Sequence, residues 1–138
     1  DYTLKICGVD PGPLPHTSEG PPDCVISCCL SSDNRFVVSS SYDKTLKIWD
    51  LETGSLLQTL EGHQHWVTSC CLSSDNRFVV SASWDNTLKI WDVETGSLLQ
   101  TLEGHQHWAS SCCLSSDNRF IISASRDKTL KIWNVNLD

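Results

Sequence analysis

The chain repeats itself at a fixed offset of 42 residues. The segment GSLLQTLEGHQHW at 54–66 returns unchanged at 96–108. LSSDNRF begins at 30, 72 and 114, and TLKIW begins at 45, 87 and 129. A period of this length is typical of repeat arrays, in which each unit is a small element that cannot bury its apolar faces alone. The stability and the function of the chain should therefore depend on contacts between neighbouring copies.

Composition narrows the class of protein. The sequence has no Met and begins inside a repeat, because DYTLKI at 1–6 matches DKTLKI at 43–48, so we expect a part of a larger array. No signal-peptide pattern occurs and no apolar run approaches the roughly 20 residues that span a bilayer, which favours a soluble protein without a membrane partner. The net charge of −7 argues against nucleic acid as a partner, since such binding needs clustered Lys and Arg.

Eight cysteines are present, and six of them form repeated pairs at 28–29, 70–71 and 112–113. Adjacent side chains on a strand point to opposite faces, and these pairs recur with the rest of the unit. We therefore expect these cysteines to act as small buried apolar residues in a reducing compartment, rather than to form a scaffold of disulfides. This pattern leads us to expect a cytoplasmic location, with the nucleus left open.

Each unit has an all-β pattern. Apolar or β-branched runs at 66–72, 78–83, 87–91 and 97–102 alternate with turn clusters of Ser, Asp, Asn and Gly. The connections are too short for parallel crossovers, so each unit should be a four-stranded antiparallel meander.

Short motifs carry a resemblance to a known family. Gly-His at 62–63 and 104–105 opens a unit, and Trp-Asp at 49–50 and 91–92 lies near its end. A Ser-x-Asp-x-Thr turn recurs at 41–45, 83–87 and 125–129. Over about residues 24 to 138 the chain resembles the WD-repeat family of β-propellers.

The chain departs from the family pattern at both ends. The last unit has Trp133 followed by Asn134, the first has Pro21 where the others have His, and Cys7-Gly8 stands in place of Trp-Asp. All five prolines lie between residues 11 and 22, so we expect no regular outer strand there.

The resemblance implies blades whose strands run from an inner strand a to an outer strand d, with each sequence repeat straddling two blades. It divides the chain into 1–23, a remnant of a preceding repeat with a Pro-rich connection; the repeats 24–61 and 62–103; and 104–138, a repeat lacking its outer strand. The expected fold is all-β, with an incomplete ring of about three blades. Propellers contain about 4 to 8 blades, so this chain should be a fragment of a closed propeller or a building block for one, including a homo-oligomer.

One set of residues imitates a catalytic triad. In the family, buried Ser, His, Asp and Trp form a structural hydrogen-bonded tetrad, and the resemblance implies two such sets here. They are His63, Ser81, Asp85 and Trp91, and again His105, Ser123, Asp127 and Trp133. The set recurs in two repeats, which favours a structural role over a catalytic one, because a nucleophile needs an exposed hydroxyl beside an oxyanion site. Ser83 and Ser125 lie on the same strand faces, so the choice of serine stays open.

No metal, cofactor or catalytic site is expected. The His-Gln-His runs at 63–65 and 105–107 could share a metal, but further ligands at suitable spacing are missing and one His of each run belongs to a tetrad. The sequence also has no Gly-rich phosphate loop and no CxxC motif.

The copies differ at one informative position. Tyr42, Trp84 and Arg126 are equivalent, and the resemblance implies that they face the top surface of the propeller, near other variable or aromatic positions. The predicted partner-binding residues are Tyr42, Trp66, Thr68, Trp84, Trp108, Ser110 and Arg126. Large amphipathic side chains dominate interface energy, although exposed aromatic residues scattered on loops can also be incidental.

These observations favour a non-catalytic scaffold that binds a protein or peptide through its top-face loops. The alternative is the sensor propeller of a larger signalling ATPase, which a phosphate-binding loop outside residues 1–138 would reveal. An enzymatic propeller is a remote third.

Overall fold

The computed structural model describes residues 3–6, 16–19 and 24–137. Every element in them is a β-strand. The strands are β1 (Thr3–Ile6), β2 (His16–Glu19), β3 (Val25–Leu30), β4 (Phe36–Ser41), β5 (Leu46–Asp50), β6 (Leu56–Leu60), β7 (Val67–Leu72), β8 (Phe78–Ser83), β9 (Leu88–Asp92), β10 (Leu98–Leu102), β11 (Ala109–Leu114), β12 (Phe120–Ser125) and β13 (Leu130–Asn134). None of these residues belongs to a helix that could cross a membrane.

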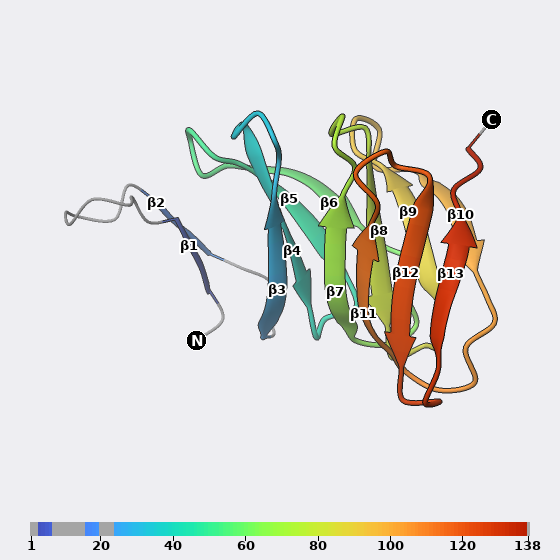
Figure 1. The fold of residues 1–138 in the computed structure, drawn as a ribbon. Helices are drawn as coiled ribbons and strands as arrows, with labels where there is room; N and C mark the ends of the chain where they lie inside the picture. Colours follow the sequence, from blue (N-terminus) through green and yellow to red (C-terminus); the bar gives the residue numbers. More distant parts are fainter. Residues whose placement is uncertain (1–2, 7–15, 20–23, 138) are drawn as a thin grey trace.

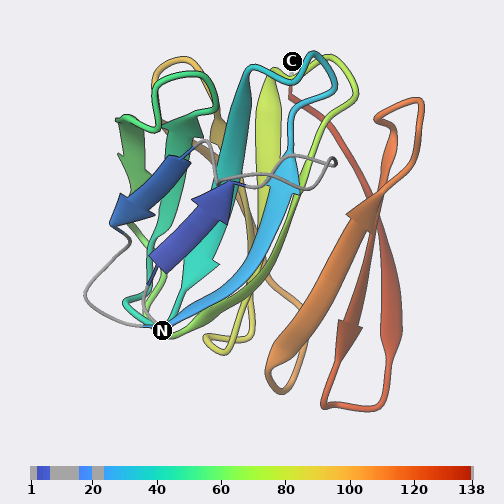
Figure 2. The same ribbon diagram turned by 90° about the vertical axis from the view of Figure 1, so that its left-hand side faces the viewer.

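The strands of the described residues form three antiparallel blades and a separate two-stranded sheet. β3–β6 make blade 1, β7–β10 make blade 2, and β11–β13 make blade 3, which has three strands. β1 and β2 pair as a separate two-stranded sheet. The sheets lie side by side as a fan with β1 and β2 at one end and blade 3 at the other, so the ring is not closed (Figure 1). The view along the array shows the same order from another side (Figure 2).

Repeated turns explain why the chain folds back within each blade. In the turn between β7 and β8, the Ser73 hydroxyl donates to Asp75 Oδ1 at 2.6 Å and accepts the backbone N–H of Arg77 at 3.0 Å. Asn76 closes this turn with φ 62°, a left-handed conformation that Asn tolerates better than most residues. The sequence Ser-Ser-Asp-Asn therefore specifies a tight hairpin in each copy.

Most of the apolar core lies between blades rather than within one. One cluster joins β5 residues Leu46 and Ile48 to Val67, Cys70 and other residues of blade 2. Both β5 side chains are almost completely buried, at 0 % and 1 % exposure. A second cluster joins blades 2 and 3 in the same way. Each blade therefore depends on its neighbour, as expected for a repeat array.

Two expectations from the sequence are wrong. β2 is a strand within the proline-containing stretch, paired with β1 from Thr3↔Glu19 to Ile6↔His16. It runs between Pro15 and Pro21, and residues 16–20 contain no proline, so every ladder N–H is available. The cysteines also differ in burial: Cys70 and Cys112 are buried, whereas Cys28 and Cys113 are exposed because no complete blade covers them.

Candidate functional site

The site is built where two connections of each blade meet. In an antiparallel meander, the loop entering the inner strand and the turn between the second and third strands lie at the same end of the sheet. The backbone bond from Trp84 N–H to Trp66 O, 3.0 Å, ties these two segments together in blade 2. Arg126 N–H and Trp108 O make the same 3.0 Å bond in blade 3. We call this end of the array the top face.

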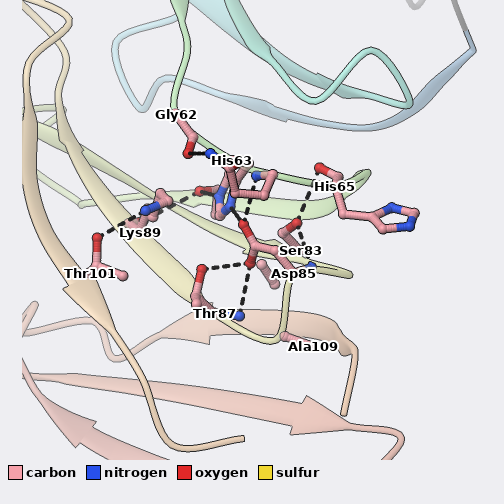
Figure 3. A network of polar contacts seen from close by, with 12 residues as sticks. Gly62, His63, His65, Ser83, Asp85, Thr87, Lys89, Thr101 and Ala109 are labelled. Atoms are coloured by element: carbon pink, nitrogen blue, oxygen red, sulfur yellow. Dashed lines mark hydrogen bonds and ion pairs between the residues drawn. The ribbon is translucent and has the colours of Figure 1, made fainter. Parts of the chain in front are cut away.

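A buried polar chain stands beneath the top face of blade 2. Trp91 Nε1–H donates to Ser81 Oγ at 2.8 Å, His63 Nε2 lies 2.6 Å from the same oxygen, and His63 Nδ1 lies 2.7 Å from Asp85 Oδ2. A neutral imidazole with its proton on Nδ1 satisfies both of its contacts. Figure 3 shows His63 and Asp85 at the centre of this network. The four predicted residues thus lie in one connected set.

The carboxylate of Asp85 anchors the set to both top-face segments. It accepts the backbone N–H of Gln64 at 3.0 Å, the N–H of Thr87 at 2.9 Å and the Thr87 hydroxyl at 2.6 Å (Figure 3). Gly62 lets the entering loop pass over Trp91, because it has φ 155° and an added Cβ would lie 3.0 Å from the ring. The Gly-His pair is thereby explained by the close approach of Gly62 to the Trp91 ring and by the two hydrogen bonds of His63.

Blade 3 has the same network and blade 1 has part of it. His105 contacts Ser123 Oγ at 2.7 Å and Asp127 Oδ2 at 2.8 Å, and Trp133 donates to Ser123 at 2.8 Å. In blade 1, Trp49 Nε1–H donates to Ser39 Oγ at 2.9 Å. The position that corresponds to His63 is Pro21, which lies outside the described residues.

An aromatic stack runs across the top face of all three blades. Tyr42 stacks on Trp66 with ring centroids 4.2 Å apart, Trp66 lies 4.4 Å from Trp84, and Trp84 is parallel to Trp108 at 3.7 Å. The Arg126 guanidinium ends the series 5.8 Å from the Trp108 ring centroid. We call these five residues the aromatic ladder. They come from three blades, so only stacking of the blades brings them together.

Comparison with known protein families gives a direct result. The family described as WD domain, G-beta repeat (WD40) matches residues 12–50, 54–92 and 96–134. The chain belongs to the WD-repeat family. Each matched segment begins with an outer strand and continues into the next blade, as 54–92 spans β6 and β7–β9. No curated protein matches the chain.

The geometry settles which serine belongs to each WD tetrad. Ser81 and Ser123 make the Trp and His contacts. Ser83 instead donates to His65 O at 3.2 Å and accepts the N–H of Asp85 at 3.1 Å. The two serines share a strand face, but only the one deeper in the strand lies within reach of the Trp ring on the neighbouring strand.

Two of the predicted surface residues lie apart from the aromatic ladder. Thr68 donates to Ala109 O at 2.9 Å, so its hydroxyl joins blade 2 to blade 3. Ser110 is exposed and donates within its own blade to Ala124 O at 3.3 Å. Thr68 therefore supports the junction beneath the ladder rather than offering a free hydroxyl to a partner.

Sequence reasoning missed two histidines beside the ladder. His65 packs edge-on against Trp66 at 5.2 Å, and its Nδ1 accepts the Trp66 N–H at 2.8 Å. Figure 3 shows its ring pointing away from the network around Asp85. His107 repeats this arrangement at Trp108. The His-Gln-His sequence was the available signal for these residues. Its first histidine belongs to the buried network, and its second lies beside the aromatic ladder.

This arrangement provides structure rather than an exposed nucleophile. Ser81 is 0 % exposed and its hydroxyl is surrounded by Trp91, His63 and the Lys89 carbonyl. A substrate would have to enter the buried blade to reach it. Within the described ranges, no three His, Cys, Asp or Glu side chains gather as a metal-binding group.

Hydrogen bonding also controls the ionisation of the tetrad carboxylates. Burial by itself would raise the pKa of Asp85, but hydrogen bonds from His63 and Thr87 outweigh burial and hold the pKa well below its usual value. Asp127 has a lowered pKa for the same combination of causes, with Thr129 as its strongest hydrogen-bond donor. Both tetrads therefore favour an ionised carboxylate.

Acid should weaken the blades through these carboxylates. A lowered folded-state pKa means that the stabilisation is fully present above about pH 4, the ordinary pKa of Asp in an unfolded chain, and is lost as pH falls below it. Urea denaturation at a series of pH values should show the free energy of unfolding falling in this range. Asp85→Asn should be less stable at neutral pH and show a shallower acid dependence. An equal acid slope in the two proteins would contradict the role given to Asp85.

Proposed function

We propose that this chain is a non-catalytic protein-interaction scaffold and that the aromatic ladder is its partner-binding surface. WD-repeat propellers are typically used for protein–protein interaction, and the chain belongs to that family. The observation that supports the ladder is its continuity: Tyr42, Trp66, Trp84, Trp108 and Arg126 follow one another without a gap across three blades.

The ladder has the physical properties of an interface. Trp66, Trp84 and Trp108 are each only partly buried, so part of each side chain remains accessible to a partner. Mutual stacking holds the rings in place, which lowers the entropy lost on binding. Aromatic and Arg side chains are also the residues that contribute most to binding hot spots.

The tetrads support this surface from below. The His63 network fixes the loop that carries Trp66, and Asp85 directly follows Trp84 in the chain. A rigid layer beneath variable exposed positions is the arrangement that lets one scaffold present different side chains. The exposed position of the b-c turn is Tyr42, Trp84 or Arg126 in the three copies, while the residue that follows it is always Asp.

Selection from a phage-displayed random peptide library tests this proposal. We expect the selected peptides to protect the backbone amides around Trp66, Trp84 and Trp108 from hydrogen exchange and to change the indole fluorescence. Peptides that protect only the opposite end of the blades, around Asp75 and Arg77, would overturn the assignment. Selection that yields no peptide above background would also count against a peptide-binding surface.

A further inference from the structure

Two pairs of cysteines meet at the junctions between the blades. Cys29 Sγ of β3 lies 3.5 Å from Cys70 Sγ of β7, and Cys71 Sγ of β7 lies 3.8 Å from Cys112 Sγ of β11. The inner strands β3, β7 and β11 stand next to one another (Figure 1). The two cysteines of β7 point to opposite sides of their strand, so one meets blade 1 and the other meets blade 3. Each junction thus holds one dithiol, and both junctions are built alike.

The sulfur atoms of each pair need only a small movement to bond. A disulfide has an S–S length of about 2.05 Å, so each pair has to close by less than about 2 Å. Rotation of a cysteine side chain about its Cα–Cβ bond moves the sulfur by distances of this size, so the strands need not slide past one another. The buried sulfurs also occupy equivalent places: Cys70 Sγ lies 3.8 Å from Val38 O, and Cys112 Sγ lies 3.7 Å from Val80 O.

Each pair combines an accessible cysteine with a protected one. Cys29 and Cys71 are partly exposed, whereas Cys70 and Cys112 are buried. A reagent from solution therefore reaches the first kind more readily, and the buried thiol stands beside whatever adduct forms there. A neighbouring thiol that resolves such an adduct is the usual arrangement of a cysteine that is oxidised reversibly. The same division of roles occurs at both junctions.

We propose that these two dithiols are sites of reversible oxidation, and that a small-molecule disulfide such as oxidised glutathione converts them into two interblade disulfides in the folded chain. Cys29 and Cys71 react first, and Cys70 and Cys112 complete the bonds. The thiols in the structure are the reduced form of both sites.

The reaction at each site is two successive thiol–disulfide exchanges. The thiolate of the partly exposed cysteine attacks one sulfur of oxidised glutathione, whose S–S bond breaks. One glutathione leaves as a thiolate and takes up the proton that the cysteine gave up, so a mixed disulfide remains on the protein. The thiolate of the buried cysteine then attacks the protein sulfur of this mixed disulfide, and the second glutathione leaves in the same way. Each dithiol loses two electrons, and one oxidised glutathione gains them.

Oxidation ties the inner strands of all three blades into one covalent series. The bond from Cys29 to Cys70 closes a loop that contains β4, β5 and β6, and the bond from Cys71 to Cys112 closes a loop that contains β8, β9 and β10. A disulfide that closes a long loop stabilises the folded state by restricting the unfolded chain. The oxidised array therefore resists unfolding more than the reduced array does.

Peptide mapping tests the pairing. The chain is equilibrated in an oxidising glutathione buffer at mildly alkaline pH, and its remaining thiols are blocked with N-ethylmaleimide. The band at the monomer mass of 15.4 kDa is then digested with trypsin without a reducing agent. Cleavage after Lys and Arg places the three adjacent cysteine pairs on a first peptide, 6–35, a second, 48–77, and a third, 90–119. We expect one species that joins all three peptides and that a reducing agent separates.

Single replacements assign each bond. Cys29→Ala should release the first peptide and leave the second joined to the third. Cys71→Ala should release the third peptide and leave the first joined to the second. Cys28→Ala and Cys113→Ala are the matched controls, because they change exposed cysteines beside the paired ones, and both should keep the three peptides joined. Three unlinked peptides from the parent chain, or a first peptide that stays linked in Cys29→Ala, would overturn the proposal.

Two further measurements show whether the folded blades select these pairs and gain stability from them. The same buffer with concentrated urea should give a mixture of linkages, because the unfolded chain does not hold particular cysteines together. The oxidised parent should also melt roughly 5 °C or more above the reduced parent. An identical pairing from the unfolded chain, or equal melting temperatures of the oxidised and reduced forms, would contradict a stabilising bond built into the blade junctions.

Discussion

Replacing Asp85 with Ala should lower the free energy of unfolding by about 3 kcal/mol, because it leaves several buried hydrogen-bond donors without their acceptor. The carboxylate is 2.7 Å from His63 Nδ1, and both side chains are nearly inaccessible. The backbone N–H groups of Gln64 and Thr87 lose the same acceptor. Urea denaturation monitored by circular dichroism measures the loss.

Blade 1 offers a matched control for this change. Asp43 occupies the equivalent position and accepts the N–H and hydroxyl of Thr45, but no described histidine contacts it. Asp43→Ala should therefore cost clearly less than Asp85→Ala. Equal losses in the two variants would show that the turn bonds to Thr, and not the histidine network, carry the stabilisation.

Replacing Trp84 with Ala should weaken binding of ladder-directed peptides by about 2 kcal/mol or more, close to a thirtyfold loss of affinity. Trp84 stands at the middle of the ladder and contacts both Trp66 and Trp108. Its removal deletes an anchor and also releases the two neighbouring rings from their stacked positions. Isothermal titration with a selected peptide gives the affinity, and thermal melting checks that the blade still folds.

Arg77→Ala is the control for the binding measurement. Arg77 lies in the turn between β7 and β8, at the opposite end of blade 2 from the ladder. This change should leave peptide affinity nearly unaltered. If Arg77→Ala weakened binding while Trp84→Ala did not, the partner surface would be at the bottom of the blades.

The repeat made much of the fold accessible from the sequence. Turn residues and alternating apolar residues lie close together in the sequence, so the expected strand 78–83 coincides with β8. β7 and β10 begin one residue later than expected, and β9 is shifted by one residue at both ends. The strand β2 was not predicted, since counting prolines ignored the proline-free residues between them.

The candidate site, like the fold, was only partly predictable from the sequence. The resemblance to the WD-repeat family implied a tetrad of His, Ser, Asp and Trp, but two serines on one strand face satisfied that pattern equally. The hydrogen bond from Trp91 Nε1–H selects Ser81, whereas the Ser83 hydroxyl donates to His65 O. Likewise, divergence among the copies singled out Trp84, while its parallel stacking on Trp108 depends on two blades.

The sequence by itself determined the blade and its turns, because these depend on contacts within one unit or between adjacent connections, and its resemblance to the WD-repeat family implied the His, Asp and Trp of each tetrad. Only the tertiary structure decided which cysteines are buried, that Thr68 joins two blades, and that five separated side chains form one ladder. The physical reason is that identical copies have identical local sequences but different neighbours. Leu88 and Leu130 show this most simply, since the same strand pattern is fully buried beneath one blade and exposed at the end of the array.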